Sequence, residues 1–98
     1  MNNRNKRSNP SCELYRAILK LRTPEECHRF FLDLCTHSEL CAMEQRYEVA
    51  KMLESGLIYS EILEKTGASS ATISRVNRSL VNGQDGYEMV FRRLNEGE

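Results

Sequence analysis

The sequence predicts an all-α protein, and three observations support this prediction. Apolar residues recur three and four positions apart along most of the chain, as they do on the buried face of a helix. Helix-start patterns, in which Ser, Thr or Asp precedes a Glu by three positions, occur at 23–26, 36–39 and 85–88. No segment alternates apolar and polar residues as a half-buried strand does. We therefore expect helices alone.

The length of 98 residues suits one domain with a small core. Residues 1–10 have no apolar side chain beyond Met1, so we expect a disordered basic tail there and a single domain over residues 11–95. So small a core buries little apolar surface, and dimerisation is one common remedy. No apolar run approaches the ~20 residues of a membrane span, and no signal-peptide pattern is present, so we expect a cytoplasmic protein with no membrane partner.

Three helices are predicted in the first half of the chain. The first should begin after Ser11 and run to about Arg22, and the second should begin at Pro24. The third and longest should span residues 37–55 and stop at Gly56. The second helix should present an apolar stripe to the core or to the seam of a dimer, formed by Cys27, Phe30, Phe31 and Leu34.

Residues 59–80 give the strongest functional signal, which is a helix-turn-helix pattern. A short helix leads to Gly67, which permits the positive φ of a sharp turn, and Ser69 is placed to cap a second helix. An ordinary corner between two helices also uses glycine. Small polar residues at the start of the second helix, with arginines later, instead favour DNA binding. Its apolar face holds Ile73, Val76 and Leu80, and its outer face holds Ser70, Thr72, Ser74, Arg75 and Arg78.

A last helix is predicted after the break at Asn82-Gly83. The pattern at 85–88 should form its capping box, and its apolar stripe needs a second surface to cover it. In so small a chain, that surface is expected to belong to another subunit. We therefore expect four side chains to be buried between subunits: Phe30, Phe31, Val90 and Phe91.

The net charge is zero, from 14 basic and 14 acidic side chains, but the charges are unevenly distributed. Residues 1–24 hold six basic side chains and one acidic, whereas residues 25–65 hold nine acidic and four basic. Residues 66–84 contain two arginines and no acid. This asymmetry permits nucleic-acid binding.

Neither the cysteines nor the glycines predict a metal site or an enzyme. The four cysteines form no CxxC pair, so we expect reduced thiols that pack as small apolar groups. A zinc site from Cys35, His37 and Cys41, with Cys27 or His28, is the alternative, but its spacing is wider than structural zinc prefers. No glycine-rich phosphate loop is present, and we expect no catalysis and no metal.

Over residues 36–80 the sequence resembles the Trp repressor superfamily, and within it the small YerC/YecD group. The stretches that show this are EQRYEVAKMLESG (44–56), GASSATISRVNRSL (67–80) and NGQDGY (82–87). The resemblance extends weakly over nearly all of residues 11–95. It implies an intertwined all-α homodimer in which each subunit offers one helix-turn-helix to successive major grooves of double-stranded DNA.

The resemblance also implies a position for a tryptophan co-repressor. Four residues fall on matching ligand-binding positions: Thr36, Arg46, Arg75 and Ser79. The family's glycine beside the indole falls on Val76, whose branched side chain should occupy part of that pocket. Tryptophan is therefore doubtful as a ligand, and the sequence names no other effector.

The sequence thus predicts a homodimeric, sequence-specific DNA-binding regulator, most simply a repressor. Close approach of short side chains should bring Ser70, Ala71, Thr72 and Ser74 against base edges, while Lys65, Arg75 and Arg78 contact phosphates or brace the fold. Ser69 completes the candidate DNA-binding set. The alternative is a protein-interaction module that uses the helix-turn-helix shape without sequence-specific DNA binding, which the acidic middle of the chain favours.

Overall fold

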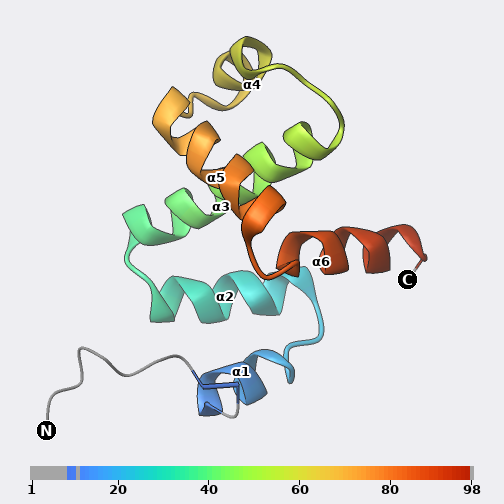
Figure 1. Cartoon of the computed structure of the whole chain (residues 1–98). Coiled ribbons are helices and arrows are strands. Elements are labelled where there is room, and N and C mark those ends of the chain that lie inside the picture. Colours follow the sequence, from blue (N-terminus) through green and yellow to red (C-terminus); the bar gives the residue numbers. More distant parts are fainter. Residues whose placement is uncertain (1–8, 11, 98) are drawn as a thin grey trace, which may run out of the picture. The chain divides into compact units, whose positions relative to one another are not determined.

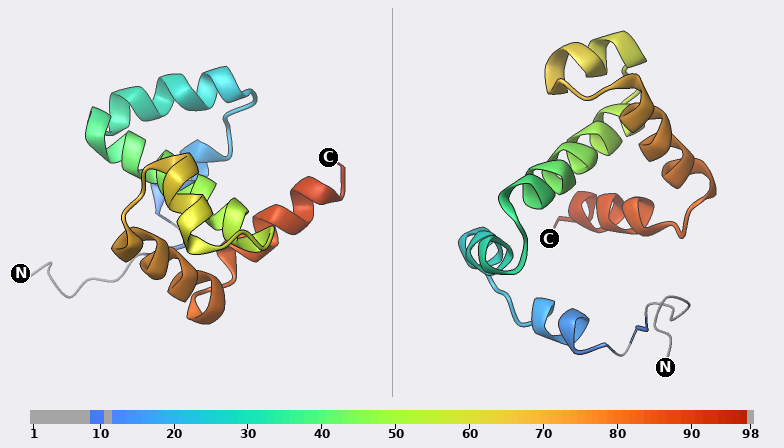
Figure 2. Two further views of the ribbon diagram at one scale, coloured as in Figure 1. Left: turned by 90° about the horizontal axis from the view of Figure 1, so that it is seen from above. Right: turned by 90° about the vertical axis from the view of Figure 1, so that its left-hand side faces the viewer.

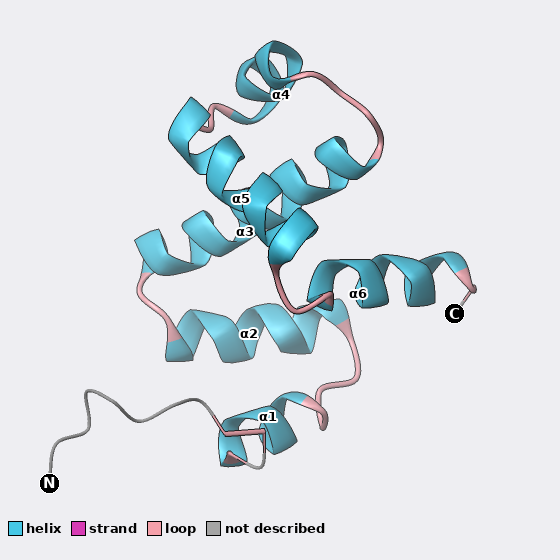
Figure 3. Cartoon of the chain, viewed as in Figure 1, coloured by secondary structure: helices cyan, strands magenta, loops and turns pink. Residues whose placement is uncertain are grey.

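The computed structural model describes residues 9, 10 and 12–97, and over these residues it is helical without a strand (Figures 1 and 3). The all-α fold class is therefore confirmed. The described residues form two compact units, one within residues 1–37 and the other within residues 38–98. In chain order the helices are α1 (Glu13–Ile18), α2 (Pro24–Leu34), α3 (His37–Glu54), α4 (Tyr59–Thr66), α5 (Ser70–Asn82) and α6 (Gly86–Asn95).

Two predictions, the disordered basic tail and the first helix cap, concern residues that lie partly or wholly outside the described part of the chain. Residues 1–8 of the predicted tail are not described, nor is Ser11, the predicted cap of the first helix. Among the described residues, no helix is both long enough and apolar enough to cross a membrane.

Helix α1 is shorter than predicted, ending at Ile18 rather than near Arg22. After its end, the N–H of Lys20 donates to the carbonyl of Ala17, only three residues back, so the chain tightens into a turn. The N–H of Arg22 donates to the Glu26 carboxylate at 2.8 Å. Arg22 is thus bonded to the start of the next helix, and the last turn predicted for α1 does not form.

Helix α2 begins where the sequence predicts. Pro24 occupies its first turn, and Thr23 Oγ1 accepts the N–H of Glu26 at 3.1 Å. In a complete capping box the Glu26 carboxylate would accept the N–H of Thr23. Here it accepts the N–H of Arg22, one residue earlier. The N-terminal capping of α2 therefore extends back into the connection from α1.

The apolar stripe of α2 is only partly covered. Cys27, Phe30 and Phe31 are half-buried, Leu34 is 49% exposed, and no residue of α2 is buried. The rings of Phe30 and Phe31 meet edge to face with centroids 5.6 Å apart. The stripe is therefore not part of a core within the single chain, and its burial in the seam of a dimer stays a prediction.

In the second unit, α3 ends in a Schellman motif. The N–H of Gly56 donates to the carbonyl of Leu53 at 3.0 Å, and that of Leu57 donates to Met52 at 3.1 Å. Gly56 has a φ of 91°, so glycine is required there by the backbone. The predicted stop of this helix is confirmed.

One hydrophobic core holds the second unit together. Both views of Figure 2 show α4 and α5 beside α3, and buried side chains join these three helices to α6. Seven side chains form this core: Val49, Ala50, Ile62, Ala68, Ile73, Val76 and Phe91.

Phe91 is buried within its own chain. It is 8% exposed within its own chain, and its ring centroid lies 5.6 Å from that of Tyr47 on α3 and 6.0 Å from that of Tyr87. Val90, its neighbour, is 42% exposed. The expectation that Phe91 is buried between subunits is therefore wrong, because its own chain already covers it.

Helix α6 begins without the predicted capping box. Asp85 precedes it with a φ of 63°, and its side chain makes no capping hydrogen bond. A capping residue needs an extended backbone to aim its oxygen at the first turn, and a left-handed backbone does not provide this. Glu88 instead accepts two hydrogen bonds from Arg92 Nη1, at 2.8 and 2.9 Å.

Candidate nucleic-acid interface

The first helix of the helix-turn-helix is α4. Its start is stabilised by the Glu61 carboxylate, which accepts the N–H of Ile58 at 3.1 Å. Ile62 is fully buried and fixes the helix to the core. Gly67 ends the helix with a φ of 73°, and its N–H donates to the carbonyl of Leu63 at 2.8 Å. The turn predicted at Gly67 is confirmed.

The turn itself is held by hydrogen bonds on both sides. Thr66 Oγ1 donates to the carbonyl of Ile62 at 2.7 Å and accepts the N–H of Ala68 at 3.1 Å. From α3, Gln45 Nε2 donates to the carbonyl of Thr66 at 3.1 Å. Sequence reasoning missed Gln45, since a polar residue between apolar positions of a helix carries no signal of a partner 21 positions away.

The second helix, α5, begins at the cap that the sequence predicts. Ser69 Oγ accepts the N–H of Thr72 at 3.1 Å and donates to Thr72 Oγ1 at 3.1 Å. Ile73 and Val76 are buried on its inner face. The hydroxyls of Ser69 and Thr72 are thus bonded to each other at the outer surface of the first turn.

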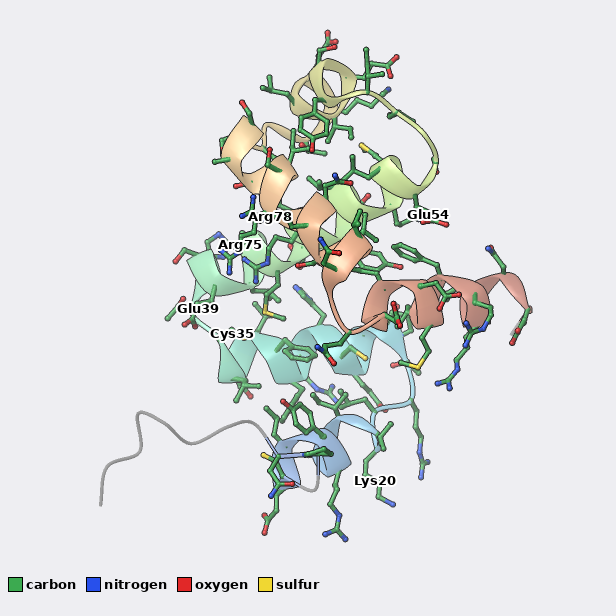
Figure 4. The ribbon with its side chains drawn as sticks, in the orientation of Figure 1. Lys20, Cys35, Glu39, Glu54, Arg75 and Arg78 are labelled. Carbon is green, nitrogen blue, oxygen red and sulfur yellow. The ribbon has the colours of Figure 1, made fainter. Side chains whose placement is uncertain are left out.

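The predicted contact residues of α5 lie at its surface. Arg75 and Arg78, labelled in Figure 4, are exposed and stand three positions apart, hence on neighbouring points of one helix surface. Lys65, in the last turn of α4, is also exposed. Among the small residues, Ser69, Ser70 and Ala71 are exposed, whereas Thr72 and Ser74 are half-buried.

Acidic side chains border this surface on α3 and α4. Glu61 and Glu64 are exposed on α4. Lys65 lines a hollow of about 290 Å³ together with Glu44 and Glu48 of α3. The positive charge of the motif is therefore concentrated on α5, where the sequence lacks acids.

The four residues of the implied tryptophan site come from different parts of the chain, and their meeting in one pocket stays a prediction. Arg46 is half-buried on α3, while Arg75 and Ser79 are exposed on α5. Ser79 lines a hollow of about 570 Å³ that neither arginine lines, and Thr36 belongs to the first unit. The lining of this hollow comprises Tyr47, Ser79, Gly83, Gln84, Gly86, Tyr87, Met89 and Val90.

The cysteines form no metal centre in the described part of the chain. Cys12, Cys27, Cys35 and Cys41 are all free thiols. No group of three or more His, Cys, Asp or Glu side chains in residues 9, 10 and 12–97 is placed to hold a metal ion.

Comparison with known proteins agrees with this architecture. A family model described as Trp repressor protein matches residues 12–95. The uncharacterized protein YerC of Bacillus subtilis (strain 168) is 52% identical over 86 residues, which cover 88% of this chain and 83% of YerC.

Two solved structures share the fold. A TrpR-like protein from Eubacterium eligens ATCC 27750 has 55% identity and a TM-score of 0.82, with 88% of this chain and 89% of that one covered. A candidate Trp repressor from Staphylococcus aureus has 47% identity and a TM-score of 0.85, with coverage of 97% and 95%. The chain belongs to the Trp repressor family.

Proposed function

We propose that this chain is a sequence-specific DNA-binding transcriptional regulator that represses its targets as a homodimer. The observation that supports this most strongly is α5 itself. Buried Ile73 and Val76 hold it to the core, while its outer face combines small side chains with two arginines and no acid. Membership of the Trp repressor family supports the same function.

On this surface, side-chain length separates the residues that we assign to base edges from those that we assign to phosphates. Short side chains allow the first turn of α5 to approach base edges closely, and we assign that role to Ser70, Ala71, Thr72 and Ser74. Long, exposed cations reach phosphates at the groove edges, and we assign that role to Lys65, Arg75 and Arg78. Ser69 sets the start of α5 and lies next to the base-reading residues.

The homodimer is supported by apolar surface that the single chain leaves open. Leu32 and Leu34 of α2 are each 49% exposed, and Leu94 of α6 is 56% exposed. Val90 lines the hollow of about 570 Å³ together with other apolar side chains of the second unit. A second subunit would remove this surface from water, which is favourable.

We further propose that tryptophan is not the co-repressor. Val76 is 2% exposed and belongs to the core, at the position where the resemblance places a glycine beside the indole. A packed interior has no spare volume for a ring where a valine already stands. Arg46 and Arg75 are then available for phosphate contact or for bracing the motif.

Fluorescence anisotropy tests the main proposal. The full chain is titrated into a labelled duplex that it has itself selected from a random pool, and into a scrambled duplex, at several salt concentrations. We expect the selected duplex to bind roughly 10³-fold or more tightly, with affinity that falls as salt rises. Equal binding of all duplexes without salt dependence would contradict sequence-specific recognition.

The exposed acids of α3 and α4 keep one second candidate open, a protein-docking role for the motif. That role predicts a partner that remains bound after nuclease treatment and after Arg75→Ala and Arg78→Ala. A nuclease-treated pull-down therefore separates the two functions.

A further inference from the structure

The turn between α4 and α5 is tied to α3 by a side chain that lies outside the helix-turn-helix. Gln45 Nε2 donates to the carbonyl oxygen of Thr66 at 3.1 Å. Thr66 is the last residue of α4, and a carbonyl at this end of a helix has no partner within the helix. Both residues are half-buried, so the bond is partly shielded from water.

From Thr66, the contacts continue to the start of α5. The Thr66 hydroxyl bonds the carbonyl of Ile62 on one side and the N–H of Ala68 on the other. Ala68 is 1% exposed, so it cannot shift without disturbing the core, and the next residue, Ser69, caps α5. A continuous series of contacts therefore runs from α3 to the first turn of α5.

We propose that Gln45 is a positioning residue for DNA recognition, which holds the turn and thereby the first turn of α5 where base reading requires it. This inference rests on the proposed function and adds to it a residue outside the surface assigned to DNA. Hydrogen bonds to base edges weaken within a few tenths of an ångström, so they depend on the placement of α5. Phosphate contacts from long flexible side chains such as Lys65 tolerate displacement.

The experiment compares variants of the full chain on two duplexes, one selected by the wild-type chain from a random pool and one scrambled. Gln45→Met keeps the length of the side chain and removes the donor, and Thr66→Val removes the hydroxyl at nearly constant shape. In each we expect the ratio of selected to scrambled affinity to fall roughly three- to tenfold, the effect of one ordinary hydrogen bond. Thr66→Ser, which keeps the hydroxyl, should keep the wild-type ratio.

The affinity ratio separates positioning from mere stability. A destabilised variant loses the same folded fraction on both duplexes, so its ratio stays at the wild-type value. If Gln45 and Thr66 act through one turn, the double variant should lose less than the product of the two single effects.

Two outcomes distinguish this inference from the function on which it rests. A wild-type chain that selects no sequence overturns the proposed function, and the inference falls with it. A wild-type preference that survives intact in Gln45→Met overturns the inference alone.

Discussion

The volume of the side chain at position 76 on α5 determines whether the core is filled there or leaves room for a ligand. It is 2% exposed and packs in a core that also contains Val49 and Phe91. A glycine there would leave a gap of nearly a whole valine side chain between α5 and its neighbours. Because the Val76 side chain fills this part of the core, no space is left there for an indole ring.

Val76→Gly should lower the free energy of unfolding by about 3 kcal/mol, from lost apolar burial and from glycine in a helix. Val81→Gly is the matched control, since Val81 lies on the same helix but is 68% exposed, and it should cost about 1 kcal/mol or less. Urea denaturation measures the free energy of unfolding of both variants.

Calorimetry should show no tryptophan binding to the wild-type chain, whereas the Val76→Gly variant should gain affinity for tryptophan. Tight binding by the wild type would refute the steric argument.

Arg75→Ala and Arg78→Ala should each weaken DNA binding in a way that shows in its salt dependence. If each arginine neutralises a phosphate, the slope of log affinity against log salt should fall by about one per substitution. Arg92→Ala is the control, because Arg92 lies on α6 and already pairs with Glu88 at 2.8 Å. An unchanged slope in both α5 variants would show that these arginines brace the fold instead.

At the scale of the element, the starts and ends of helices decide the shape of the motif. Ser69 precedes α5 with an extended backbone and caps it, whereas Asp85 precedes α6 with a left-handed backbone and does not. The same class of residue thus acts differently, because capping depends on the backbone that presents the side chain. Between α4 and α5 the critical residue is Gly67, whose φ of 73° favours glycine.

Gly67→Ala should cost about 1–2 kcal/mol of stability, since an alanine Cβ is strained in the left-handed region. Its Cβ would meet no atom within 4 Å, so the cost comes from the backbone alone. Gly86→Ala also meets nothing within 4 Å but has no positive φ, and it should be neutral or slightly stabilising. Thermal denaturation of the two variants checks this contrast, and equal effects would contradict it.

At the scale of the whole molecule, the chain leaves much apolar surface uncovered. The described residues of α1 and α2 include no buried side chain, and Met89, Val90 and Leu94 of α6 are all more than a third exposed. Exposure on this scale is costly in water and is typical of surfaces that meet another protein. The stability of the proposed dimer should therefore depend on these helices.

Because the proposed dimer seam would cover the half-buried ring of Phe31, Phe31→Ala should cost on the order of 3–5 kcal/mol and weaken folding and assembly together. Sedimentation equilibrium over a range of concentrations, combined with denaturation, follows both. Leu63→Ala, at an apolar position of α4 that is 46% exposed, should leave the dimer intact. A wild-type chain that is monomeric at micromolar concentration would contradict the shared core.

A dimer with one helix-turn-helix per subunit also constrains its operator. Two linked motifs should read half-sites roughly 34 Å apart, one helical turn of DNA. Inserting about 5 base pairs between half-sites turns one of them to the opposite face of the duplex and should abolish tight binding in a gel shift. Undiminished affinity for the lengthened operator would exclude simultaneous reading by both motifs.

Helix starts and ends that depend on local signals could be predicted from the sequence. Pro24 and Thr23 start α2, Gly56 ends α3, and Gly67 with Ser69 defines the helix-turn-helix; all act within a few residues along the chain. The family resemblance over residues 36–80 has the same basis, since it too is read from a contiguous pattern. The proposed contact residues of α5 follow from that pattern and stay a prediction.

Contacts between residues far apart in the chain could be seen only in the folded structure. The folded structure buries Phe91 against Tyr47, whereas the sequence predicts Phe91 between subunits. It also brought Gln45 to Thr66. Burial and long-range hydrogen bonds depend on which helices pack together, and periodicity along one helix shows a face without showing what covers it.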